Sequence, residues 1–92
     1  MLSYTVDGPL NIYSITEHHQ QVLQKRDTAQ DYELNLAGVN EIDATGVQWL
    51  LWIEREQRNN QRHLILHNPS QAIQGALQQC GCEALLVGAR YE

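Results

Sequence analysis

The spacing of apolar residues changes repeatedly along this chain between the two-residue period of a strand and the 3.6-residue period of a helix. Residues 32–36 (YELNL) and 63–67 (HLILH) alternate as half-buried strands do. A helical period begins at Asp43 and holds until the polar run 57–61, and another spaces apolar residues from Ile73 to Cys80, after a helix-start signal at residues 68–71. The predicted order is β(β)αβαβαβ, which indicates an α/β domain with helices packed on a sheet.

The predicted element boundaries rest on turn and capping residues. Leu2–Val6 and Leu10–Tyr13, separated by a Gly-Pro break, predict one or two early strands. Ser14 and Glu17 have the spacing of a capping box before the first helix. Asn68, followed by a proline, predicts the N-cap of the last helix. The closing residues 82–92 suit either a short strand or a helical turn.

Length and charge restrict the classes of function. With 92 residues the chain is long enough for one compact domain, so we expect a single domain over residues 1–92. Six Lys and Arg face eleven Asp and Glu, and this excess of negative charge argues against nucleic acid and against anionic membranes as partners. The start of the chain lacks the pattern of a signal peptide, and no apolar run approaches the ~20 residues of a membrane span. A soluble, cytoplasmic protein is therefore expected.

The corner between the second predicted strand and the following helix reads Asp43-Ala44-Thr45-Gly46. A carboxylate at this place can accept hydrogen bonds from the free N–H groups of the first helical turn. The small residues that follow keep that turn open to solvent or to a partner, although small residues at a helix start also serve tight packing. The corner is thus a candidate docking point.

The faces of the helix that follows suggest which residues meet a partner. The face expected to pack on the sheet consists of Val47, Leu50, Leu51 and Glu54, with Ile53 beside it. The opposite face consists of Thr45, Trp49, Trp52 and Glu56. If this second face looks outward, two indoles lie in line with the Thr45 hydroxyl, which is the composition of a protein-binding hot spot. The competing interpretation is that the tryptophans pack under a neighbouring helix, because Trp is usually mostly buried.

These segments resemble the STAS domain, the fold of the anti-sigma factor antagonists. The resemblance is carried by LNLAGVNEIDATGVQWLL and by HLILHNPSQAIQGALQQCG, and GPLNIYSITEHHQQVLQ fits the second strand and first helix of that family. It implies a STAS-like α/β fold, with a mixed β-sheet and helices packed largely on one face. It also implies a non-enzymatic regulatory module that binds a protein partner.

The resemblance extends to a phosphorylation motif with one departure. In phosphorylated STAS domains an Asp is followed by the phosphoacceptor Ser or Thr, a small residue and Gly, and Asp43 and Gly46 match the flanking positions. The acceptor position is Ala44, which has no hydroxyl, and Thr45 lies one residue later. A shift of one residue turns a helical side chain by about 100°, so Thr45 as a candidate phosphoacceptor would face a kinase differently.

The resemblance implies partner switching, in which the unphosphorylated domain binds a kinase-type anti-sigma factor and frees the sigma factor. The resemblance leaves two other functions open. One is a STAS protein that works with chemotaxis or two-component signalling proteins, and the other is a STAS subunit that binds the ATPase of a phospholipid ABC transporter. The residues expected to bind the partner are Asp43, Ala44, Thr45, Gly46, Gln48, Trp49 and Trp52.

Other reactive residues give weaker signals. Cys80 and Cys82 could suggest a metal or redox site, but metal sites normally need four ligands, and Cys80 continues the apolar stripe of its helix. From a different class, the competing function is a small thiol enzyme centred on these two cysteines, which would need a reactive, solvent-accessible thiol. His63 and His67 lie about 13 Å apart on a strand, too far to share a metal. No catalytic motif of a hydrolase, nucleotide-binding enzyme or metalloprotease occurs. We therefore expect no catalytic residues, no metal site and no cofactor.

Overall fold

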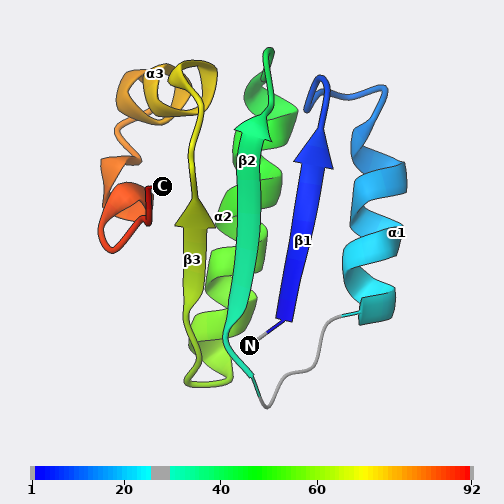
Figure 1. Cartoon of the computed structure of the whole chain (residues 1–92), viewed down its shortest axis with the longest axis vertical. Helices are drawn as coiled ribbons and strands as arrows, with labels where there is room; N and C mark the ends of the chain where they lie inside the picture. The colour runs from blue at the N-terminus through cyan, green and yellow to red at the C-terminus, as the bar shows by residue number, and fades with distance from the viewer. Residues whose placement is uncertain (1, 26–29, 92) are drawn as a thin grey trace.

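A computed structural model describes residues 2–25 and 30–91 and shows three strands, three α-helices and one 3₁₀ helix (Figure 1). Within these residues no helix is both long enough and apolar enough to cross a membrane. The elements are β1 (Leu2–Asp7), α1 (Ile15–Lys25), β2 (Tyr32–Gly38), α2 (Ala44–Asn59), β3 (Leu64–His67), α3 (Gln71–Gln79) and η1 (Glu83–Leu86).

The three strands form one sheet in the order β1-β2-β3, and both pairings are parallel. Tyr32 in β2 lies opposite Leu2 in β1 and opposite Leu64 in β3. Each strand reaches the next through a helix, as parallel pairing requires. The α/β fold with helices on a sheet is thus confirmed, but the described sheet is wholly parallel and not mixed.

The helices cover one face of this sheet, and α2 runs behind β2 in the view of Figure 1. Strand residues that point towards the helices are buried, including Val6, Leu34 and Leu66. Most of the alternate residues are polar, apart from Ala37 and Ile65, and on that face the Nδ1 atom of His67 lies 3.0 Å from a carboxylate oxygen of Glu33. One buried face and one mostly polar face explain the alternation of the sequence in these strands.

The segment Leu10–Tyr13, predicted as a strand, forms a turn after an isolated bridge between Leu10 and Ile42. The side chain of Asn11 accepts hydrogen bonds from the backbone N–H groups of Tyr13 and Ser14 (2.9 and 3.2 Å). Such a side-chain turn replaces strand pairing, which explains the wrong prediction.

The start of α1 differs from the predicted capping box. The Ser14 hydroxyl donates to the carbonyl oxygen of Pro9 (2.7 Å) and accepts from the backbone N–H of Asn11 (3.1 Å). It therefore stabilises the turn before the helix and does not cap the amide of Glu17.

The N-cap of α3 is Ser70 and not Asn68. The Ser70 hydroxyl accepts a hydrogen bond from the backbone N–H of Ile73 (3.2 Å). Asn68 instead adopts a left-handed conformation with φ 51°, a region that Asn tolerates better than most residues. The proline between them follows this kink, so the helix begins two residues later than predicted.

The C-terminal segment combines both predicted alternatives. Residues Glu83–Leu86 form η1, and Arg90 then bridges to His67 in the parallel sense. The Arg90 N–H donates to Leu66 O (2.9 Å), and the Asn68 N–H donates to Arg90 O (2.7 Å). This short contact covers the end of the outer edge of β3.

Candidate partner-binding site

Asp43 lies where the chain leaves the sheet and enters α2, and both of its carboxylate oxygens accept hydrogen bonds. Oδ1 accepts from the backbone N–H of Gly46 (3.1 Å), which makes Asp43 the N-cap of α2. Oδ2 accepts from the backbone N–H of Ile12 in the β1–α1 loop (3.2 Å). One side chain thus fixes both the start of the helix and the loop beside it.

Gly46 has an internal role at this corner. It is buried, and a Cβ atom at this position would lie 2.5 Å from the backbone oxygen of Leu10 and 2.8 Å from a side-chain carbon of Ile42. The glycine therefore permits the β1–α1 loop to pass close to α2. Its small size serves packing within the chain, so Gly46 is not available as a surface contact.

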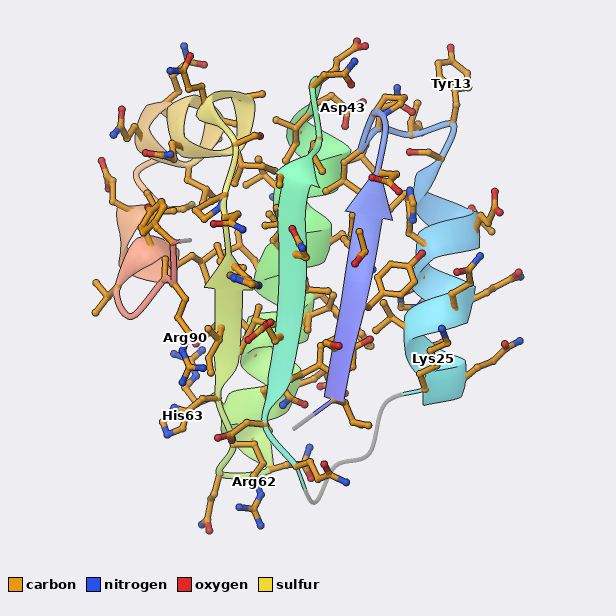
Figure 2. All side chains as sticks on the ribbon, viewed as in Figure 1. Tyr13, Lys25, Asp43, Arg62, His63 and Arg90 are labelled. Atoms are coloured by element: carbon orange, nitrogen blue, oxygen red, sulfur yellow. The ribbon has the colours of Figure 1, made fainter. Side chains whose placement is uncertain are left out.

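The surface at the corner is formed by Ala44, Thr45 and Gln48 together with the β1–α1 loop. Ala44 and Gln48 are exposed, and Thr45 is half-buried. The loop adds two large apolar side chains, Ile12 (61% exposed) and Tyr13 (93% exposed). Figure 2 shows Tyr13 and Asp43 at the same end of the molecule, with Tyr13 pointing away from the sheet. Exposed aromatic and aliphatic side chains beside a fixed backbone are typical of binding surfaces.

The sequence prediction missed Ile12 and Tyr13 as surface residues because it assigned them to a strand. Two signals for the alternative were present: the preceding Gly-Pro break and Asn11, a residue that favours turns. A turn needs no apolar side chains for pairing, so two such residues next to Asp43 are candidates for function.

The prediction that Trp49 faces outward is wrong. Trp49 is 5% exposed, and its Nε1–H donates to Nδ1 of His19 in α1 (3.1 Å). Trp52 is half-buried, and its ring meets that of His19 edge to face at 4.9 Å. The two indoles therefore pack beneath α1, because α1 lies on that side of α2 and leaves a seam that large rings fill. We call these three side chains the tryptophan seam.

The buried face of α2 is accordingly rotated from the predicted one. Its buried residues are Gly46, Val47, Trp49, Leu50, Ile53 and Gln57. Leu51 and Glu54, predicted to pack on the sheet, are half-buried. We call the side of α2 that faces away from the sheet the outer ridge; its members are Ala44, Gln48, Leu51, Trp52 and Arg55. Ala44, Gln48 and Arg55 are exposed, and Leu51 and Trp52 are half-buried, so that Trp52 belongs both to the seam and to the ridge.

A shallow hollow of about 470 Å³ runs along this ridge towards the first turn of α1. It is lined by Ile15, Thr45, Gln48, Trp49, Leu51, Trp52 and Arg55. The Thr45 hydroxyl therefore borders a concave surface with apolar walls. Arg55 was not singled out from the sequence, although its spacing from Gln48 and Leu51 places it on the same face.

A second hydrogen-bonded group holds α1 against β1. The Tyr4 hydroxyl lies 2.9 Å from Nδ1 of His18 and donates to Oε1 of Gln21 (3.1 Å). Burial raises the pKa of Tyr4 above its ordinary value of 10.0, and the nearby carboxylates of Glu17 and Asp7 raise it further. The phenol stays neutral, as a donor to Gln21 must.

The two cysteines lie between α3 and η1. Cys80 is exposed, so the prediction that it continues the buried stripe of its helix is wrong: it is the C-cap residue, where the chain turns away from the sheet. The Cys82 thiol is half-buried and donates to the carbonyl oxygen of Cys80 (3.4 Å). Among residues 2–25 and 30–91, no cluster of three His, Cys, Asp or Glu side chains could hold a metal ion.

Comparison with known proteins agrees with this architecture. A protein-family model described as "Mlab, STAS domain" matches residues 5–88, which includes every strand and helix apart from the first residues of β1. A search of curated proteins gave no significant match. STAS domains are in general regulatory modules that interact with protein partners and are generally not enzymes. Since the match covers nearly the whole chain, this protein belongs to the STAS domain family.

Proposed function

We propose that this STAS domain is an anti-sigma factor antagonist that acts by partner switching and binds its partner at the corner around Asp43. The observation that carries the proposal is the exposed pair Ile12 and Tyr13 next to the N-terminus of α2. The partner surface would extend from this pair over Ala44 and Thr45 onto the outer ridge. Asp43 would act indirectly, by holding the loop and the helix in one arrangement.

The chemistry of this surface suits a protein partner. Tyr13 and Ile12 offer apolar area that costs free energy when left in water. The adjacent N-terminus of α2 has N–H groups that favour negative charge, and Gln48 and Arg55 supply polar contacts at the rim. An apolar centre with a polar rim is the usual composition of a protein interface.

Thr45 is the proposed phosphoacceptor of the switch. Its half-buried side chain borders the hollow beside the outer ridge. A phosphate there would add about −1.5 to −2 charge within one helical turn of Asp43 and would occupy the surface that a partner contacts. Phosphorylation would therefore release the partner.

The exposed Ala44 supports a second candidate function. It occupies the acceptor position of phosphorylated STAS domains and cannot accept phosphate. A domain without the covalent switch would bind its partner constitutively, as a STAS subunit on the ATPase of a phospholipid ABC transporter would. A role beside chemotaxis or two-component proteins would use the same surface.

Capture of the partner from the native host separates these functions. The tagged wild-type protein is compared with Tyr13→Ala and with Tyr91→Ala, a control that removes another exposed tyrosine (60% exposed) near the C-terminus. The proposal expects a kinase-type anti-sigma factor that is retained by the wild type and by Tyr91→Ala and is lost with Tyr13→Ala. A transporter ATPase or a chemotaxis protein with the same dependence would establish the corresponding alternative. Equal retention by all three proteins would contradict the proposed surface.

The switch itself is tested by intact-mass analysis of the protein isolated from its host, with fragmentation to place any phosphate. Phosphate on Thr45, lost in Thr45→Val, supports partner switching. If the protein is unmodified under several growth conditions, the proposed phosphorylation of Thr45 is contradicted, and only the proposed partner binding stands.

A further inference from the structure

A second surface, distant from the corner at Asp43, lies along the outer edge of β3. We propose that this edge binds an extended, acidic segment of a partner protein, which adds to the sheet as a short fourth strand. The proposal rests on three features that meet there: backbone groups on the strand edge, an adjacent apolar hollow, and a cluster of basic side chains.

The backbone of β3 presents hydrogen-bonding groups outward. The His63 carbonyl accepts from Tyr32 N–H (3.0 Å) and so points towards β2. The Leu66 carbonyl accepts from Arg90 N–H and so points to the opposite, outer side. Because successive backbone groups of a strand alternate between its two edges, Leu64 presents its N–H and C=O outward as well. Within the described part of the chain these Leu64 groups have no backbone partner, since the C-terminal segment pairs only beyond Leu66.

An open hollow of about 700 Å³ lies beside this edge, between β3, the second half of α2 and η1. Its apolar lining includes Leu51, Leu64, Leu85 and Val87. Val87 is 82% exposed, so its side chain offers apolar area to an occupant of the hollow. A strand added to β3 would direct every second side chain towards this hollow.

The rim of the hollow is basic, although the chain has a formal charge of −5. Arg58, Arg62 and His63 line it, and Figure 2 shows Arg90 and His63 on the outer side of β3 and Arg62 below the start of that strand. Three of the six Lys and Arg residues therefore gather at this edge. Arg58 is paired with Glu54 at 3.5 Å, but Arg62 and Arg90 have no ion pair among the residues that the structure describes.

Charge and pattern together define the occupant. The unpaired edge groups lie between Arg62 and Leu66, because the Arg62 N–H donates to Gln57 O and the Leu66 carbonyl accepts from the Arg90 N–H. This leaves room for about three residues of an extended peptide at ~3.3 Å each. Aliphatic side chains at alternate positions would fill the hollow, and Asp or Glu between them would meet Arg62 and Arg90. Backbone pairing would supply affinity and the side chains specificity, as in other cases of strand addition.

The test uses three synthetic peptides with the full chain, followed by ¹H–¹⁵N NMR titration. The first is acetyl-Glu-Val-Asp-Val-Glu-Val-amide, the second replaces its acids by lysine, and the third keeps the acids but carries N-methyl groups at alternate amides. The proposal expects saturable binding of the first peptide alone, with shifts centred on Leu64, Leu66 and Val87. The corner residues Ile12 and Tyr13 should not shift, so this surface is judged separately from the proposed function.

Charge-reversed variants give the matched control. Arg62→Glu/Arg90→Glu should lower the affinity for the acidic peptide by about tenfold or more, because both contacts become repulsive. Gln20→Glu/Gln24→Glu/Lys25→Glu on α1 makes the same change in net charge away from β3 and should leave the affinity within about twofold. Both variants alter exposed side chains, and their spectra report directly whether the fold is intact.

Several results would overturn the proposal. Absence of saturable binding by the acidic peptide is one, and equal binding of the N-methylated peptide, which indicates charge attraction without strand pairing, is another. Equal weakening by the β3-edge variant and by the α1 control variant would show that net charge alone matters. Shifts at Leu64 that depend on protein concentration without any peptide would assign the edge to a second copy of this chain.

Discussion

The corner at the start of α2 and the tryptophan seam between α1 and α2 differ in how they use aromatic residues. At the N-terminal corner, Tyr13 is 93% exposed beside a carboxylate that binds two separate segments. One turn further along the helix, Trp49 is 5% exposed and forms the tryptophan seam with α1. The larger aromatic residue thus stabilises the fold, and the smaller one is offered to solvent. An aromatic residue on a helix is a functional candidate only after its neighbours are known.

Trp49→Ala should have the largest effect of any substitution that distinguishes the seam from the corner. Removing a buried indole leaves a cavity between α1 and α2, so the free energy of unfolding should fall by about 3 to 5 kcal/mol. Urea denaturation followed by circular dichroism measures this change. Trp49→Phe keeps a ring but loses the hydrogen bond to His19, so its free energy of unfolding should lie between those of the wild type and Trp49→Ala. A Trp49→Ala protein of normal stability that fails to bind its partner would place the indole on the surface instead.

Tyr13→Ala should affect binding and leave stability nearly unchanged. Loss of an exposed hot-spot aromatic should weaken binding of the partner by about 2 kcal/mol or more. A substitution in an exposed loop should change the free energy of unfolding by less than about 0.5 kcal/mol. Calorimetric titration with the captured partner gives the first quantity and urea denaturation the second. Tyr91→Ala serves as the control for both. The comparison fails if Tyr13→Ala destabilises the chain as strongly as Trp49→Ala does.

Asp43→Ala should have an intermediate effect, because Asp43 contributes to both stability and site geometry. Loss of an N-cap costs about 1 kcal/mol, with a range of about 0.5 to 2. Asp43→Asn separates the two hydrogen bonds, since its carbonyl oxygen can still cap Gly46 while its amide group cannot accept from Ile12. We expect Asp43→Asn to keep most of the stability in urea denaturation and to lose affinity for the partner. Equal affinities for Asp43→Asn and the wild type would show that the loop is held in place without this link.

The smallest expected effect concerns Tyr4 of β1, which packs against α1. Its raised pKa means that the ionised phenol is less favourable in the folded chain than in the unfolded one. Its contribution to stability is therefore fully present below about pH 10 and is lost as pH rises through the folded-state pKa. Urea denaturation between pH 8 and pH 11 should show the difference between wild type and Tyr4→Phe shrinking at the alkaline end. A constant difference would contradict the raised pKa.

Local chemistry made the main elements predictable. Alternation in residues 32–36 and 63–67 identified β2 and β3, since one face of each is buried and the other polar. The helical period after Asp43 identified α2 and its N-cap, because the carboxylate acts within a single turn. The corner motif and the segment around it also carried the resemblance to the STAS family, which the family match confirms.

The sequence could not show which face of α2 is covered. Helical spacing sorts residues into faces, but the neighbour that buries a face comes from a distant part of the chain, here His19 of α1. The same limit applies to residues 10–13, where the side chain of Asn11 competes with strand pairing. Exposure of Ile12 and Tyr13 follows from that competition.

The sequence by itself therefore determined the α/β order of elements, the cap at Asp43 and the family, because these depend on contacts within a few residues. The tertiary structure decided that the tryptophans pack against α1 and that Tyr13 reaches solvent. It also decided that basic residues from α2, from the connection between α2 and β3 and from the C-terminal segment meet at one strand edge. Those features depend on the packing of segments far apart in the chain, which periodicity does not encode.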